Sequence, residues 1–154
     1  LAPISLAHWS RHHRILQSRE AWVTMRDWIE RFNPRLSPEV SKIYAYGQGI
    51  SDSEVEEARS VRSAILERVD ALLAVDSVIC MPTAPGPAPL RGHSESYGDR
   101  ISMLTCVASA TGVPQLTMPL GQIDGMPIGL SLLGPRGSDE ALIGFGRKLA
   151  YLGG

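Results

Sequence analysis

Apolar side chains recur at helical spacing over two long stretches in the first half of the chain. In residues 4–32 they fall on one helix face: Ile15, Trp22, Met25, Ile29 and Phe32. A second stripe, which includes one arginine, runs through residues 51–74: Val55, Ala58, Arg62, Ile65, Val69 and Leu72. Between them, Ser37 suits an N-cap and Pro38 suits a first helical turn, so a shorter helix is predicted up to about residue 49.

The third of these predicted helices has a distinct start signal. Ser51 stands three residues before Glu54, the spacing at which a capping serine and a glutamate satisfy each other's backbone N–H groups. Glu56 and Arg59 are also three residues apart, which favours a supporting charge pair on the helix surface. The first half of the chain is therefore predicted to consist of three helices.

Short apolar runs separated by turn residues replace the helical spacing in the second half. Residues 76–81 form an unalternated run, which predicts a strand buried on both faces. Residues 115–119 and 128–133 predict two further strands, joined by turn chemistry at Asp124 and Gly125, so they are expected to pair as neighbours. Helices are predicted at about 100–111, closed by a left-handed Gly112, and from Ser138 to about 152.

The order of these elements indicates the fold class. Helices followed by β-α-β-β-α predict an α/β fold, with a small mixed sheet layered with helices. A length of 154 residues and a hydrophobic content of 44% fit one folded domain. We therefore predict a single α/β unit over residues 1–154, with a helical region at 1–75 and a sheet region at 76–154.

Charge is balanced overall but unevenly placed. The net charge of -1 gives no electrostatic basis for binding nucleic acid. Residues 101–135 contain one charged side chain, Asp124, yet prolines interrupt the run too often for a membrane span. We expect this segment to be buried sheet, and to self-associate through exposed apolar surface if nothing else covers it.

Cysteine use and the first residues bear on the compartment. Two cysteines, Cys80 and Cys106, are too few for a disulfide framework, and residues 1–6 lack the form of a secretory signal. We therefore predict a reducing, cytoplasmic setting.

Searches for metal and cofactor motifs give negative results. The sequence has no glycine-rich phosphate loop, no paired-cysteine zinc spacing and no His-Glu-x-x-His, so no cofactor and no metal are predicted. His8, His12 and His13 could suggest a metal site on the first helix. A solvated basic helix face is favoured instead, because no cysteine or acidic ligand nearby completes a coordination shell.

Two features could suggest a nucleophilic serine. Residues 92–96 (Gly-His-Ser-Glu-Ser) approximate a nucleophile elbow, but that motif needs a strand directly before the serine, and a proline-rich loop stands there. A solvated loop is the favoured interpretation. Ser-x-x-Lys is absent, and Lys42 and Lys148 are interpreted as ordinary surface lysines.

The proline-rich loop, residues 82–99, is the best local candidate for a site. It leaves the end of a predicted buried strand, where open α/β sheets place their ligands. Its prolines give it a fixed shape with little entropy to lose on binding. A purely structural crossover is the alternative.

The combined pattern resembles the C-terminal part of the amidase signature enzymes over nearly the whole chain. The matching pieces are Asp76 followed by Pro82-Thr83-Ala84-Pro85-Gly86-Pro87-Ala88-Pro89, Gly112-Val113-Pro114, Pro119-Leu120-Gly121, the segment 125–134, and Asp139 with Leu142. Residues 49–51, 57–58 and 62 are similar to the helical region that precedes this part in the family. Ser131 and Gln115 depart from the family, which commonly has glutamine and a small residue at these positions; this leaves the subfamily and the substrate open.

The resemblance implies an amide hydrolase of the Ser–Ser–Lys type, which converts an amide to an acid plus ammonia or an amine. In that family the two serines, the lysine base and the oxyanion-binding N–H groups lie N-terminal to the region matched here. No Gly-Ser-Ser-Gly occurs in this chain, so no catalytic residue is carried over. The resemblance implies only a wall of the substrate funnel, formed by Met81, Thr83, Ala84 and Pro85.

Three functional hypotheses remain open at this point. The leading one is the C-terminal portion of a longer amidase that acts on a small-molecule amide and is inactive in isolation. The second is a stand-alone, non-catalytic binding module with the same fold. The third is the amidase subunit of a tRNA-dependent amidotransferase, against which Gln115 and Ser131 argue.

Overall fold

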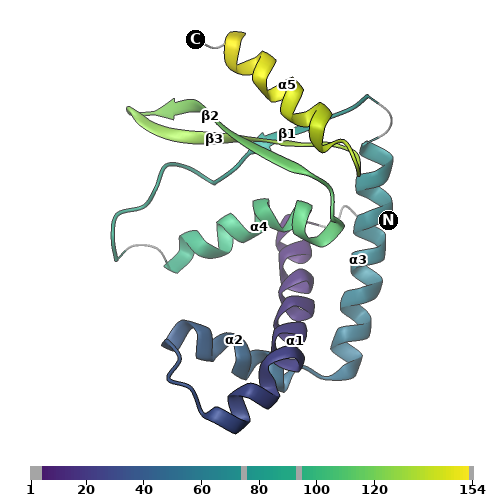
Figure 1. Ribbon diagram of the computed structural model, residues 1–154, viewed down its shortest axis with the longest axis vertical. Coiled ribbons are helices and arrows are strands. Elements are labelled where there is room, and N and C mark those ends of the chain that lie inside the picture. The colour runs from purple at the N-terminus through teal and green to yellow at the C-terminus, as the bar shows by residue number, and fades with distance from the viewer. Residues whose placement is uncertain (1–4, 74–75, 93–94, 153–154) are drawn as a thin grey trace. The chain divides into compact units, whose positions relative to one another are not determined.

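A computed structural model describes residues 5–73, 76–92 and 95–152 of the chain (Figure 1). The chain forms two compact units, Leu1–Ala64 and Ile65–Gly154, and the boundary between them falls inside a continuous helix, α3 (Asp52–Leu72). The first unit is helical in its described residues, and the second contains the β-sheet.

The first unit contains α1 (Leu6–Phe32), α2 (Pro38–Gly49) and the first part of α3, which confirms the prediction of three helices. Each of the first two starts is capped: the Ser5 hydroxyl accepts from the His8 N–H, and the Ser37 hydroxyl accepts from the Val40 N–H. Asn33 ends α1 in the left-handed conformation, with φ 42°. The helices therefore begin and end where polar and proline residues predict them to.

The predicted capping box at the start of α3 is present. The Ser51 N–H donates to Glu54 Oε2 at 2.9 Å, and the Glu54 N–H donates to Ser51 Oγ at 3.3 Å. Hydrogen bonds from the Ser51 backbone and hydroxyl hold the pKa of Glu54 below its usual value. The predicted Glu56–Arg59 pair also forms, at 3.6 Å between exposed side chains, where such pairs contribute little to stability.

Burial along α1 differs from the predicted stripe. The buried positions lie in its first two-thirds: Trp9, Ser10, His12, Ile15, Leu16 and Ser18. At the other end, Phe32, which the spacing places on the same helix face as Ile15, is 61% exposed. The apolar spacing defines a helix face, but only contact with other elements decides how much of that face is covered. In this unit Ile15 and Leu16 pack against Ile50, Val55 and Ala58.

A glycine sets how closely α2 approaches α1. A Cβ atom at Gly47 would lie 2.1 Å from the Ser18 carbonyl oxygen and 3.0 Å from Trp22 Cβ. The first of these atoms belongs to helix backbone, which cannot move aside as a flexible side chain can. Only glycine therefore permits this helix contact.

The second unit is built on three strands in the order β1–β3–β2: β1 (Ile79–Pro82), β2 (Gln115–Ile123) and β3 (Met126–Leu133). Both pairings are antiparallel, which differs from the mixed sheet expected from the sequence. The predicted hairpin is confirmed: Asp124 and Gly125 have φ values of 51° and 76°, the positive values that a tight two-residue turn requires.

Helices lie on either side of this sheet within the second unit (Figure 1). From α5 (Asp139–Leu152), Leu142 and Leu149 pack on one face of the sheet with Leu116, Met118, Leu130 and Leu132. The other helix, α4 (Glu95–Thr111), starts about five residues earlier than predicted and ends, as predicted, before a left-handed Gly112 with φ 71°.

The prediction that β1 is buried on both faces is wrong. Cys80 is exposed, and Ile79 and Met81 are half-buried. The reason is the position of β1 at the edge of the sheet, where β3 flanks it on one side only. A short apolar run does not distinguish an edge strand from a central one.

The helical stripe of α3 is confirmed at its centre, where Ile65 and Val69 are 2% and 1% exposed. At its end the prediction is wrong by one position, because Leu72 is 55% exposed and Leu73 is buried. Nearby, the Arg136 guanidinium donates to both Asp70 carboxylate oxygens, at 2.9 and 3.0 Å, and to the Thr111 carbonyl at 2.8 Å. This arginine joins α3, the end of α4 and the loop before α5.

Candidate functional site

The funnel residues expected from the sequence lie where β1 leaves the sheet. The Thr83 N–H donates to the Gly129 carbonyl at 2.9 Å, which continues the β1–β3 ladder one step beyond the strand. Met81, Thr83, Ala84 and Pro85 are all half-buried. These four residues therefore lie together at one edge of the sheet, and each is partly accessible to solvent.

A cluster of hydrogen-bonded polar side chains, here called the hydroxyl cluster, lies beside Thr83. It consists of Thr83, Gln115, Thr117 and Ser131. Ser131 is its centre and is 1% exposed. Its Oγ lies 2.7 Å from Thr83 Oγ1 and 3.3 Å from Thr117 Oγ1, and it accepts from Gln115 Nε2 at 2.9 Å. A serine hydroxyl has one proton and two lone pairs, so these three partners satisfy it completely.

The strand register explains how this cluster assembles. Met81 pairs with Ser131, and Ser131 pairs with Thr117, so the three residues lie in one row across the sheet. Gly129 leaves room beside them, because a Cβ there would lie 2.7 Å from Thr83 Oγ1 and 3.2 Å from Thr117 Cγ2. The cluster therefore links the start of the proline-rich loop to both neighbouring strands.

The other end of this loop segment is fixed by α4. The Tyr97 hydroxyl donates to the carbonyl groups of Gly86 and Pro87, the latter at 2.7 Å. Residues 83–87 are thus held at Thr83 by the hydroxyl cluster and at Gly86 and Pro87 by Tyr97. Sequence reasoning did not identify Tyr97, because a single tyrosine in a predicted loop gives no periodic or motif signal.

The titratable and nucleophilic candidates of the sequence do not form a reaction centre among the described residues. Burial raises the pKa of the Cys106 thiol to about 11, which keeps it protonated and unreactive. Lys42 and Lys148 are exposed, as predicted. In the elbow-like segment, Gly92 has φ 85°, whereas the central residues 93–94 lie outside the described residues.

The three histidines of α1 differ from one another, and the solvated-face interpretation is wrong for His12. Its side chain is buried, with Nδ1 2.8 Å from the His8 carbonyl oxygen and Nε2 3.7 Å from Glu57 Oε1. His8 is exposed and His13 half-buried. Desolvation, followed by the influence of His12, lowers the pKa of His8. In residues 5–73, 76–92 and 95–152, no three His, Cys, Asp or Glu side chains gather as a metal site would need.

Comparison with known proteins identifies the family. The family model described as Amidase matches residues 8–143. The chain belongs to the amidase family. This agrees with the resemblance found in the sequence, and the α/β architecture described above is that of the family's solved structures.

Three curated relatives carry different names. Amidase 1 of Arabidopsis thaliana is 31% identical over 150 residues, covering 95% of this chain and 35% of the relative. Translocon at the outer membrane of chloroplasts 64 of Pisum sativum is 34% identical, covering 83% of this chain and 22% of the relative. A glutamyl-tRNA(Gln) amidotransferase subunit of Exiguobacterium sibiricum is 36% identical, covering 65% of this chain and 21% of the relative.

A solved structure also agrees with membership of the amidase family. A crystal structure of an amidase superposes with a TM-score of 0.82 at 27% sequence identity, covering 98% of this chain and 37% of that chain. The chain spans about a third or less of the length of these curated relatives and of this structure. In the part of the chain that is described, no helix combines the length and apolarity needed to cross a membrane.

Proposed function

We propose that this chain is part of an amide hydrolase in which residues 81–85 line the path of a small-molecule amide to the reaction centre. The observation that carries the proposal is the double fixation of the loop, by the hydroxyl cluster at Thr83 and by Tyr97 at Gly86 and Pro87. A wall that selects substrates must keep its shape, because loosely held contacts discriminate poorly between similar ligands. Membership of the amidase family supports the reaction class.

The nucleophile and the base are proposed to lie outside these 154 residues. Both lysines have exposed side chains, so neither has the desolvated position that a lysine base needs. We therefore expect the purified 154-residue chain to hydrolyse no amide. Turnover by this chain that is abolished by changing one of its own serines would contradict the proposal.

The wall itself can be tested in the longest protein that the native gene encodes. Ala84→Leu places a larger side chain at a half-buried loop position, whereas Ala88→Leu places the same side chain at an exposed position of the same loop. For each variant, kcat/KM is measured on amides with acyl groups of increasing size. Ala84→Leu should change the ratio of kcat/KM for the largest acyl group to kcat/KM for the smallest by about tenfold or more. Ala88→Leu should leave this ratio unchanged. Equal effects of the two variants would show that Ala84 is not part of a substrate wall.

The second candidate is a non-catalytic binding module. The relative that is named as a chloroplast translocon component supports this candidate, because its name describes no hydrolytic activity. The two hypotheses differ in what the native gene encodes upstream of Leu1. A lysine followed in frame by a Gly/Ser-rich segment supports the hydrolase, whereas a stop codon and a ribosome-binding site there support the module.

The third hypothesis, an amidotransferase subunit, predicts a different substrate. The relative named as an amidotransferase subunit supports it. If it holds, the full-length protein should release ammonia from glutamine, and a partner subunit with charged tRNA should be needed for full turnover. The cytoplasmic setting stays a prediction from cysteine use, and self-association of the chain stays a prediction from its apolar segment.

A further inference from the structure

Tyr97 lies in the first turn of α4 and contacts the proline-rich loop from outside the proposed substrate wall. Its hydroxyl donates to the carbonyl oxygens of Gly86 and Pro87, which precede it by 11 and 10 positions. The side chain is half-buried. One side chain therefore connects α4 to the two residues that directly follow the wall.

The loop backbone has few hydrogen-bond donors of its own. Proline, which has no N–H group, occupies positions 82, 85, 87 and 89. The N–H group of Thr83 already donates to the Gly129 carbonyl. A segment in which half of the residues lack a donor cannot hold its shape through a regular backbone ladder. Its carbonyl groups need donors from other elements, and Tyr97 supplies one at Gly86 and Pro87.

Gly86 is the position in residues 82–89 at which the backbone has the widest conformational range. It stands between Pro85 and Pro87, whose rings fix φ, whereas glycine carries no such restriction. A Cβ atom at Gly86 would meet nothing within 4 Å, so side-chain packing does not limit this position either. Tyr97 therefore holds the segment at its most adaptable point.

The two anchors of the segment differ in how many groups each one uses. At the first anchor, Thr83 contacts the buried Ser131, which is also bonded to side chains of β2. At the second anchor, a single phenol hydroxyl shares one proton between two carbonyl acceptors. Loss of this one hydroxyl should therefore release residues 84–87 at one end, while the hydroxyl cluster keeps Thr83 in place.

We propose that Tyr97 is a positioning residue that sets the shape of the wall at Ala84 and Pro85, and with it the range of acyl groups that the full-length protein accepts. This inference rests on the proposed function of residues 81–85 as a substrate wall. Tyr97 acts through the carbonyl groups of Gly86 and Pro87, so its role is to select the amide and not to take part in bond cleavage.

The inference is tested by measuring kcat/KM in the longest protein that the native gene encodes, on amides with acyl groups of increasing size. Tyr97→Phe removes the hydroxyl and keeps the ring. It should bring the ratio of kcat/KM for the best-accepted acyl group to that for the worst-accepted one about three- to tenfold closer to one. Tyr151→Phe is the matched control, because Tyr151 is 88% exposed on α5, and it should leave this ratio unchanged.

Two further readouts separate positioning from a general structural role. The change in Tyr97→Phe should appear in KM more than in kcat, since a wall contacts the acyl group in the ground state as well as in the transition state. In a Tyr97→Phe background, Ala84→Leu should also change the selectivity less than it does in the wild type. A released loop can move aside for the larger side chain, so the two substitutions are not additive.

Several results would overturn the inference. One is an equal loss of kcat/KM for every acyl group in Tyr97→Phe, which would show only a smaller fraction of correctly folded protein. Another is an additive effect of Tyr97→Phe and Ala84→Leu. If Ala84→Leu changes the selectivity and Tyr97→Phe does not, the wall stands and the role of Tyr97 fails. If Ala84→Leu has no effect, the proposed wall itself fails, and the role of Tyr97 fails with it.

Discussion

The two units of this chain are specified in different ways. In the first unit, helix ends are fixed by short-range signals such as Ser37 before Pro38 and Ser51 before Glu54. In the second, the decisive contacts join residues far apart in sequence, such as Thr83 with Ser131, 48 positions apart, and Arg136 with Asp70, 66 positions apart. Local signals can be recognised in a sequence, whereas long-range ones exist only once the chain has folded.

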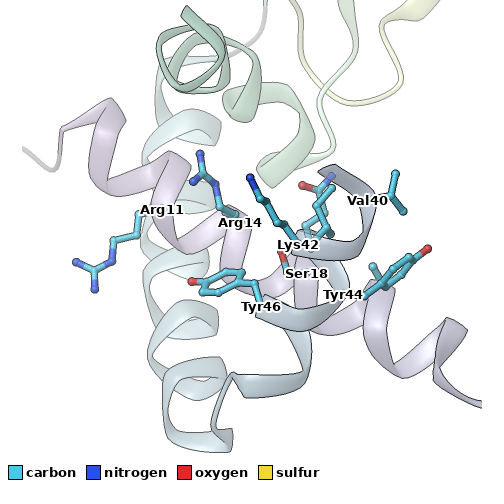
Figure 2. A pocket seen from close by; sticks show the side chains of 10 residues that line it. Arg11, Arg14, Ser18, Val40, Lys42, Tyr44 and Tyr46 are labelled. Carbon is cyan, nitrogen blue, oxygen red and sulfur yellow. The ribbon is translucent and has the colours of Figure 1, made fainter. Parts of the chain in front are cut away.

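The hydroxyl cluster of the second unit and a pocket between α1 and α2 of the first unit (Figure 2) also differ in the burial of their polar groups. In the second unit, Ser131 is 1% exposed, and its hydroxyl is hydrogen-bonded to three side chains. The pocket of the first unit has exposed cations, Arg14 and Lys42, along its edge. A buried network of this kind fixes one arrangement of its neighbours, because any other leaves a polar atom unpaired.

The largest loss of stability is expected from a substitution in the hydrophobic core of the second unit. Leu133 is 0% exposed, and Leu133→Ala should lower the free energy of unfolding by about 3 kcal/mol, through lost burial and the cavity left behind. Leu120→Ala, at a position 41% exposed in the same sheet, should cost less than about 1 kcal/mol. Urea denaturation gives both values, and equal values would contradict this description of the core.

The next effect tests the helix contact of the first unit. Gly47→Ala should cost about 2 kcal/mol, because the added Cβ meets helix backbone. Gly49→Ala provides a matched control two residues on, where a Cβ meets nothing within 4 Å; there, alanine's higher helix propensity should leave stability equal or slightly raised. In Gly47→Ala, amide hydrogen exchange should accelerate mainly in α1 and α2. An equal acceleration in the second unit would contradict the description of the two units as separate.

A smaller effect is expected at the hydroxyl cluster. Ser131→Ala removes the partner of Gln115, Thr83 and Thr117, and should cost about 1–2 kcal/mol in unfolding free energy, since buried polar groups are left unpaired. Ser109→Ala, which removes an exposed hydroxyl bonded to its own helix, should stay within about 0.5 kcal/mol. Fluorescence-detected unfolding compares the two. An unchanged stability in Ser131→Ala would show that the cluster does not hold the loop.

The smallest effect tests the local signals. Ser51→Ala should lower stability by about 1 kcal/mol, the usual contribution of a capping side chain. The matching change, Glu54→Gln, should have a pH-dependent effect. Because folding lowers the pKa of Glu54 from its usual 4.5, its stabilisation is complete above about pH 4.5 and is lost as the pH falls through the folded value.

Thermal unfolding of the wild type and Glu54→Gln across this pH range measures that effect. In a Ser51→Ala background, the stability difference that Glu54→Gln produces should shrink only in part, because the hydroxyl bond is lost while the Ser51 backbone N–H bond, the larger cause of the lowered pKa, remains. A difference that keeps its size at low pH, or that does not shrink at all in Ser51→Ala, would count against the capping box as its source.

The candidate site was only partly predictable. The sequence located the proline-rich loop, because prolines after an apolar run mark the end of a strand, whereas Thr83, Ala84 and Pro85 were singled out by the resemblance to the amidase signature enzymes. It identified Gln115 and Ser131 only as departures from a family pattern. That both belong to one cluster with Thr83 depends on strand register, which joins residues 16 and 48 positions apart.

By itself, the sequence determined the helices with their caps, the Asp124–Gly125 hairpin, the α/β class and the family, since each of these depends on neighbouring residues or on a linear pattern. Tertiary structure decided the antiparallel pairing of all three strands, the exposure of the edge strand at Cys80, the burial of His12 and the pocket at Arg14 and Lys42. The physical reason is common to these features. Burial, strand register and contacts between distant side chains depend on how elements pack against one another. The periodicity of residues within one element does not specify which other element packs against it.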